Sequence, residues 1–99
     1  MLNISKNANG EALTITLEGR LDTTTAPQLE EEITSSVNGV KDLVIDIKDL
    51  QYISSAGLRV LLSAQKIMNK QGKMTVKNPC EEVREIFDVT GFIDILTVE

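Results

Sequence analysis

Hydrophobic and polar residues alternate at the start of the chain. Leu2 and Ile4 have polar neighbours, the pair Asn9-Gly10 interrupts the pattern, and a second alternation runs over residues 13–17. Two runs of period two around an Asn-Gly turn predict an opening β-hairpin.

The pattern then becomes helical. Apolar residues recur three or four positions apart, at Ala26, Leu29, Ile33 and Val37. Thr25 begins a Thr-x-x-Gln sequence with Pro27 in its first turn, which is a helix start signal. The pair Asn38-Gly39 predicts the end of this helix.

Residues 43–47 form an almost continuous apolar run. Such a run is typical of a strand that is covered on both faces, so it predicts the central strand of a sheet. We expect a loop over residues 48–54, followed by a helix over residues 56–70 that is rich in leucine and alanine.

The last third of the chain predicts a strand, a helix and another strand. Residues 73–77 alternate as a short strand, and the sequence Asn-Pro-Cys-Glu at residues 78–81 predicts the start of a third helix. Gly91 predicts the end of that helix. Apolar residues within 93–98 predict a last short strand.

The predicted order of elements is therefore β-β-α-β-α-β-α-β. Strands that alternate with helices predict an α/β fold with right-handed crossovers and a mainly parallel sheet, which the opening hairpin makes mixed. We expect a single domain over residues 1–99, with about four to five strands and about three helices.

Charge and composition disfavour several kinds of partner and cellular location. The chain has 99 residues and a formal net charge of −5, which disfavours binding to nucleic acid or to an anionic membrane surface. No apolar run is long enough for a signal peptide or a membrane span. Cys80 is the only cysteine, which excludes an intramolecular disulfide and fits a reducing compartment. We expect a cytoplasmic protein.

The sequence also lacks the residues of common catalytic sites. There is no histidine, so a Ser-His-Asp triad is excluded and the commonest metal ligand is missing. Neither a Walker A loop nor a Gly-x-Gly-x-x-Gly motif is present. Asp22 and Asp46 are carboxylates that could pair across the strand ends, but they argue only weakly for acid–base chemistry. We expect a protein that is not an enzyme and that needs no cofactor or metal.

Two segments are expected at the carboxyl edge of the sheet, where α/β proteins gather their binding sites. They are Gly-Arg-Leu-Asp at residues 19–22 and Tyr-Ile-Ser-Ser-Ala-Gly-Leu at residues 52–58. A serine at the start of the second helix has two interpretations. Its oxygen can cap the helix, or it can accept a phosphoryl group that the free N–H groups and the helix dipole would stabilise. The small residues Ala56 and Gly57 leave the position open to a kinase.

A basic stripe begins beside these serines. Arg59, Lys66 and Lys70 share one face of the second predicted helix because they stand at positions i, i+7 and i+11. The stripe is either solvated or part of a partner surface, and the sequence favours neither. We expect Asp22 to form hydrogen bonds with the serine loop or with the first helix.

At these residues the sequence resembles the STAS family, and within it the stand-alone bacterial anti-sigma factor antagonists. The resemblance covers essentially the whole chain. Residues 19–22 match the family's early Gly-x-Leu-Asp, and residues 52–58 match its core motif, Asp-Ser-x-Gly-Leu after an aromatic-aliphatic pair. Residues 86–87 and 91–92 are similar to the family's late helix and the Gly-aromatic pair that follows it.

The resemblance implies a partner-switching mechanism. The unphosphorylated protein would bind an anti-sigma factor that is a serine kinase, and so free the sigma factor. Phosphorylation would break the complex, and a metal-dependent phosphatase of the PP2C type would restore it. The matching phosphorylation site is Ser55, with Ser54 as second choice, because Ser54 adds a hydroxyl where the family usually has Asp. The residues expected to support the site or contact the partner are Asp22, Ser54, Ala56, Gly57 and Arg59.

Two alternatives stay open. The chain could be a structural STAS subunit that holds an ABC-type transporter ATPase complex without being phosphorylated. It could also be a module that senses a small ligand.

Overall fold

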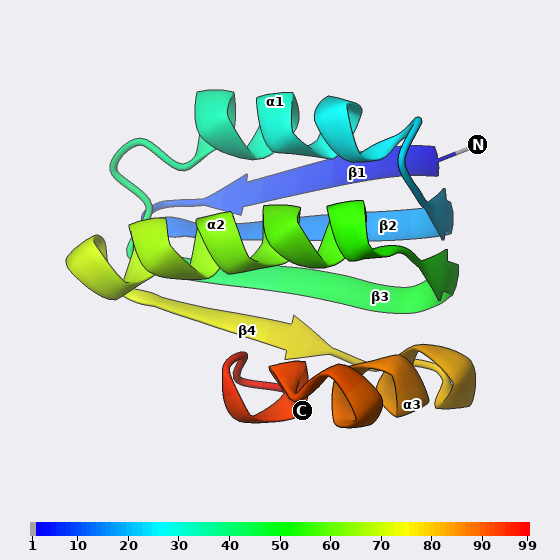
Figure 1. Cartoon of the computed structure of the whole chain (residues 1–99). Helices are drawn as coiled ribbons and strands as arrows, with labels where there is room; N and C mark the ends of the chain where they lie inside the picture. Colours follow the sequence, from blue (N-terminus) through cyan, green and yellow to red (C-terminus); the bar gives the residue numbers. More distant parts are fainter. Residues whose placement is uncertain (1) are drawn as a thin grey trace.

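Four strands form one sheet in the order β1-β2-β3-β4 (Figure 1). The computed structural model describes residues 2–99, and Met1, the first residue of the predicted 1–99 domain, lies outside the described residues. β1 (Leu2–Asn9) pairs antiparallel with β2 (Ala12–Leu21). β2 pairs parallel with β3 (Asp42–Ile53), which in turn pairs parallel with β4 (Lys73–Lys77). The predicted α/β class, opening hairpin and mixed, mainly parallel sheet are confirmed.

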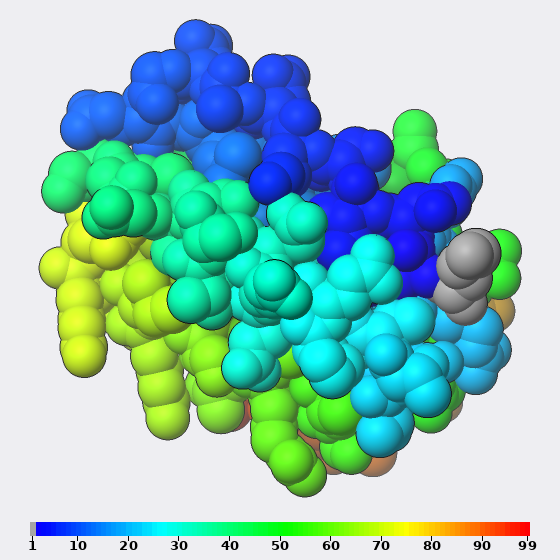
Figure 2. Space-filling view, turned by 90° about the horizontal axis from the view of Figure 1, so that it is seen from above, coloured from blue at the N-terminus to red at the C-terminus, as the bar shows by residue number. Residues whose placement is uncertain are grey.

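Two helices cover the same side of this sheet (Figure 1). They are α1 (Ala26–Ser36) and α2 (Ser55–Gln71). Figure 2 shows α1, in cyan, between β1, in blue, and α2, in green. Alternate residues of β2 are buried beneath them, because side chains along a strand point to opposite faces in turn. The resulting core lies between the two helices and the sheet.

β3 lies between β2 and β4, as predicted for the central strand, but the other face of the sheet is less well covered, so the expectation that this strand is covered on both faces is wrong. Leu43, Ile45 and Ile47 are buried, whereas Val44 and Asp46 between them are only half-buried. Val44 stands next to Thr14 of β2 and Thr75 of β4 in the sheet. Neighbouring threonine side chains, rather than a second layer of helices, surround this valine on the open face.

The expected loop over residues 48–54 is also wrong, since β3 continues to Ile53. β3 has 12 residues where β2 has 10, and the register between them shifts twice, between Thr16 and Glu18 and between Gly19 and Arg20 of β2. Each shift is a β-bulge that gives β3 one extra residue. Because of the bulges, the buried positions of β3 become Ile47, Leu50 and Ile53, three residues apart. A search for alternation of period two cannot recognise that spacing as a strand.

The helix α3 (Glu81–Thr90) lies beside the part of β3 that extends beyond β4. The helix start predicted from residues 78–81 is wrong in its details. The N-cap residue is Cys80, and no side chain caps the helix. The Cys80 Sγ instead lies 3.3 Å from the carbonyl oxygen of Leu50, to which it donates a hydrogen bond. Gly91 ends the helix in the left-handed conformation with φ of 82°, as predicted.

The predicted strand within residues 93–98 is replaced by a short 3₁₀ helix, η1 (Phe92–Asp94). Phe92 and Leu96 stand four residues apart, and the amide of Leu96 donates to the carbonyl of Phe92 over 2.9 Å. This helical spacing places Leu96 in the core. Of the predicted strand the described residues show an isolated parallel bridge between Val98 and Val76 of β4.

We predict that the amide protons of residues 43–46 exchange with solvent more slowly than those of residues 50–53. Residues 42–46 pair with both β2 and β4, while the later part of β3 pairs with β2 alone. Amide hydrogen exchange measured by NMR tests this order. Slower exchange in residues 50–53 would contradict it.

Candidate functional site

The ends of β2 and β3 lie next to each other. Leu21 is the sheet partner of Ile53, and the amide of Ser54 donates to the carbonyl of Leu21 over 2.8 Å. This contact brings the turn that follows β2 close to the start of α2. The two segments predicted for the carboxyl edge of the sheet therefore meet there.

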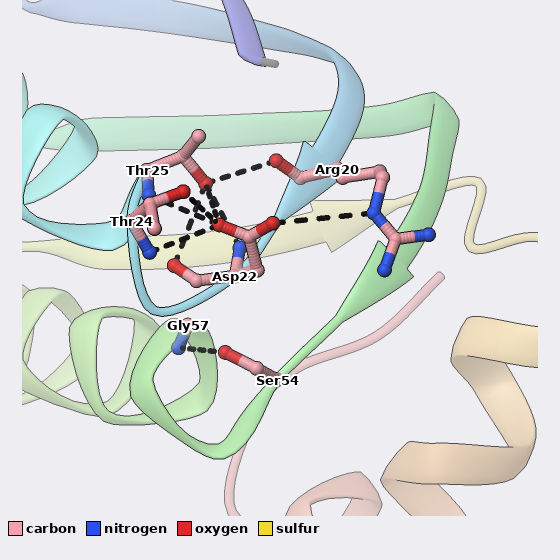
Figure 3. Close-up of polar contacts among 6 residues, drawn as sticks. All are labelled: Arg20, Asp22, Thr24, Thr25, Ser54 and Gly57. Carbon is pink, nitrogen blue, oxygen red and sulfur yellow. Dashed lines mark hydrogen bonds and ion pairs between the residues drawn. The ribbon is translucent and has the colours of Figure 1, made fainter.

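The two serines at the start of α2 have different environments. Ser54 is the N-cap residue, and its Oγ accepts a hydrogen bond from the amide of Gly57 at 3.3 Å (Figure 3). Ser55 is the first residue of the helix, one position earlier than the predicted start at residue 56, and its side chain is exposed. Among the described residues no side-chain hydrogen bond to the Ser55 hydroxyl is present. Capping therefore falls to Ser54, and Ser55 presents its hydroxyl to solvent.

Gly57 allows the first turn of α2 to approach the sheet closely. A Cβ atom at this position would lie 2.6 Å from Cγ of Leu21 and 2.9 Å from Cγ1 of Ile53. Both of these side chains are fully buried at the ends of their strands, so they have little room to move. The glycine thus fixes how close the two serines stand to the turn after β2.

Asp22 organises that turn and the start of α1 (Figure 3). Its Oδ1 accepts hydrogen bonds from the amide and hydroxyl of Thr24, at 3.0 and 2.7 Å, and from the amide of Thr25 at 3.1 Å. The Thr24 hydroxyl, foremost, and these amide donors lower the pKa of Asp22 from its ordinary value of 3.8, because they favour the charged carboxylate. Asp22 was expected to form hydrogen bonds with either the serine loop or the first helix. The structure shows bonds to the residues that begin the first helix.

The predicted capping role of Thr25 is wrong in its details. Thr25 is the N-cap residue of α1, but its side chain does not cap the helix. Its hydroxyl donates to the carbonyl of Arg20 at 2.9 Å and accepts from the amide of Asp22 at 2.8 Å. Asp46 does not pair with Asp22 either, because it stands beside Thr16, six residues before Asp22; its Oδ1 accepts from the amide of Lys48 and the side-chain amide of Asn78.

Arg20 completes the site and was not singled out by the sequence. Its Nε lies 3.9 Å from Oδ2 of Asp22, and its guanidinium group stands 4.4 Å from the centre of the Tyr52 ring. Arg20 and Tyr52 are sheet partners only because of the second bulge in β3. Predicting this contact would require the position of the bulge in β3, and the pattern of apolar and polar residues does not reveal it.

A groove of about 280 Å³ runs between α1 and α2 beside the serines. The α1 side contributes Thr23, Pro27 and Glu30, and the α2 side contributes Ala56, Arg59 and Ser63. Arg59 of the predicted basic stripe therefore faces the groove. Lys66 and Lys70 are exposed further along the same helix.

The described residues offer few other kinds of site. No group of three histidine, cysteine, aspartate or glutamate residues within 2–99 is placed to hold a metal ion. None of the helices in this part of the chain is long and apolar enough to cross a membrane. The carboxyl edge of the sheet presents an exposed serine hydroxyl, the Asp22 turn and the groove beside them, while two larger pockets, of about 560 and 430 Å³, lie beside residues 48–51 and along α3.

Comparison with known proteins finds a matching family and several sequence relatives. The family model of the STAS domain matches residues 3–99. A Bordetella bronchiseptica protein named "Putative anti-sigma factor antagonist BtrV" is 40% identical over 84 residues, which are 83% of this chain and 72% of the relative. An anti-sigma-B factor antagonist of Bacillus subtilis is 31% identical over 98 residues, 98% of this chain and 90% of the relative.

Solved structures share the fold. The crystal structure of an anti-sigma factor antagonist from Mycobacterium paratuberculosis matches with a TM-score of 0.90 at 22% identity, over 99% of this chain and 85% of that chain. The Bacillus cell fate determinant SpoIIAA in its phosphorylated form matches with a TM-score of 0.76 at 19% identity, over 98% of this chain and 91% of that chain.

We predict that Gly57→Ala lowers the free energy of unfolding by about 1–2 kcal/mol. Overpacking against Leu21 and Ile53 costs about 1–3 kcal/mol, which exceeds the gain of up to about 1 kcal/mol from replacing a helical glycine by alanine. Urea denaturation followed by circular dichroism measures the change. Ser63→Ala on the exposed side of the same helix is the control and should not destabilise the protein. A Gly57→Ala variant as stable as this control would contradict the steric argument.

We also predict that the contribution of Asp22 to stability depends on pH. Because the pKa of Asp22 is lowered in the folded protein, its ionised form stabilises the fold above the ordinary pKa of 3.8, and this contribution is lost as the pH falls through the folded pKa. Asp22→Asn should therefore be less stable than the wild type at neutral pH. The difference should shrink between about pH 5 and about pH 2, as the wild-type carboxylate is protonated. Thermal unfolding of both proteins across this range measures it, and a difference independent of pH would contradict the assignment.

Proposed function

Because this chain belongs to the STAS domain family, we propose that it is an anti-sigma factor antagonist whose binding is controlled by phosphorylation of Ser55. The names of its sequence relatives support the first part of this proposal. The observation that carries the second part is that the two serines have different environments. Ser54 caps α2, which leaves the Ser55 hydroxyl exposed at the first residue of the helix.

Ser55 is well suited to carry a phosphoryl group. The first turn of a helix has free N–H groups and the positive end of the helix dipole, and both stabilise an anion. The Ser55 side chain is exposed, so a kinase can reach it without unfolding the domain. Ser54 is less suitable, because a phosphoryl group on its Oγ would replace an acceptor that already binds the amide of Gly57.

The proposed cycle has three states. Unmodified protein binds an anti-sigma factor that is a serine kinase, and the sigma factor is released. The kinase transfers the γ-phosphoryl group of ATP to Oγ of Ser55, the hydroxyl proton leaves and ADP is formed. A PP2C-type phosphatase then hydrolyses the phosphoserine to serine and inorganic phosphate. In this cycle the chain is a cytoplasmic substrate and binding partner, and the kinase and phosphatase perform the catalysis.

The partner surface proposed here surrounds Ser55. It comprises the Asp22 turn, Ser54, Ala56, Gly57 and Arg59, which are neighbours at the ends of β2 and β3 and along the first turns of α2. A phosphoserine adds about 1.5–2 negative charges at the centre of this surface. Leaving such a charge unpaired in an interface costs about 2–5 kcal/mol, or roughly 30- to 4,000-fold in affinity.

We predict that phosphorylation of Ser55 weakens binding to the cognate kinase at least tenfold (about 1.4 kcal/mol or more) without changing the fold. Ser55→Ala should bind like the unmodified protein and resist phosphorylation, which makes it a permanently active antagonist. Isothermal titration calorimetry gives the affinities, and circular dichroism compares the two forms. Phosphopeptide mapping identifies the modified residue.

Ser54→Ala is the matched control for this experiment. It should still be phosphorylated on residue 55, while losing about 0.5–2 kcal/mol of stability with the helix cap. Phosphorylation that persists in Ser55→Ala would assign the site to the other serine. Equal binding of the phosphorylated and unmodified forms would reject the switch and favour the alternative of a structural subunit in a transporter ATPase complex.

A further inference from the structure

Arg59 stands one helical turn after Ser55 on α2. Residues four positions apart are neighbours on a helix surface, with Cβ atoms about 5–6 Å apart. Side chains on a helix also lean toward its N-terminus, so the turn that contains Ser55 lies within the range of the long Arg59 side chain. Both residues are exposed. A change of rotamer can therefore bring the guanidinium group to the Ser55 hydroxyl.

Arg59 is also available for a new partner. The ion pairs among the described residues are Lys6 with Glu32 and Arg20 with Asp22, and neither involves Arg59. Arg20, the other arginine near the site, already lies beside Asp22 and over the Tyr52 ring. Lys66 and Lys70 stand about 16 and 22 Å along the helix from Ser55, given a rise of about 1.5 Å per residue, and are out of reach of its hydroxyl.

In the unmodified protein Arg59 belongs to the groove between α1 and α2, where Glu30 lines the opposite wall. No ion pair joins these two residues within 4 Å in the described structure. The groove therefore presents a cation to a partner in a protein whose net charge is −5. An acidic group of the partner would find its counter-charge there.

We propose that Arg59 binds the phosphoryl group of phosphorylated Ser55, and that in doing so it leaves the groove between α1 and α2. This inference rests on the proposed function, because it takes Ser55 as the modified residue. A guanidinium group can donate two parallel hydrogen bonds to phosphate oxygens, and a phosphoserine carries about 1.5–2 negative charges where a carboxylate such as that of Glu30 carries one. Phosphorylation then changes the partner surface twice: it adds an anion and withdraws a cation.

The test uses protein in which phosphoserine is incorporated directly at position 55, so that no kinase is needed. The second pKa of a phosphoserine is about 6, and a bound guanidinium lowers it by favouring the dianion. ³¹P NMR titration follows this pKa in five proteins: the parent, Arg59→Gln, Arg59→Lys, Arg20→Gln and Lys66→Gln. Lys66→Gln is the control on the same helix.

Arg59→Gln should raise the phosphate pKa by about 0.2 to 0.7 pH unit relative to the parent. Arg59→Lys should restore part of the difference, because it keeps the charge but not the paired donors. Lys66→Gln should leave the pKa unchanged. An unchanged pKa in Arg59→Gln, or a shift in Arg20→Gln alone, would overturn the inference.

Binding to the cognate kinase tests the second half of the proposal. Arg59→Gln should weaken binding of the unmodified protein severalfold, and should cause no further loss once Ser55 is phosphorylated. An equal loss in both forms would mean that Arg59 stays in the groove. The Ser55 switch is judged separately, from the affinities of the phosphorylated and unmodified parent protein. The inference can therefore fail while the proposed function stands.

Discussion

The close contact between the first turn of α2 and the ends of β2 and β3 is the constraint on which the site depends. Gly57 has no Cβ, and this absence lets the helix lie against Leu21 and Ile53. The same approach brings the Ser54 amide to the carbonyl of Leu21, one residue before Asp22. Asp22 in turn holds the start of α1 through Thr24 and Thr25. One glycine thus couples two helices and the two central strands at a single edge of the sheet.

The elements with a regular period could be predicted from the sequence. The opening hairpin follows from alternation around Asn9-Gly10, and the helices follow from their apolar spacing, although not the details of their caps. The second half of β3 could not be predicted, because its bulges convert a period of two into a spacing of three. The end of the chain could not be predicted for a related reason, since Phe92 and Leu96 have a helical spacing within a short apolar run.

The candidate site was predicted in part. The serines and Asp22 stand in recognisable motifs, and the structure brings them to one edge of the sheet. Which serine caps α2 depends on where the helix begins, and a shift of one residue decides it. The contact of Arg20 with Tyr52 depends on strand register, and the position of Arg59 in a groove depends on how α1 packs against α2. These are tertiary contacts, and a local sequence pattern does not predict them.

The two bulges in β3 also set how the segment tolerates changes in length. Between Ile47 and Ser54 each residue is either buried in the core, paired with β2 or placed in a bulge. Deleting one residue there while the pairing with β2 is kept would move Ile53 to the exposed position of Tyr52 and Ser54 to the buried position of Ile53. It would also move Ser54 away from its capping position. Insertions and deletions in related sequences should therefore gather in the turns at Gly10 and Gly39, and this strand should keep its length.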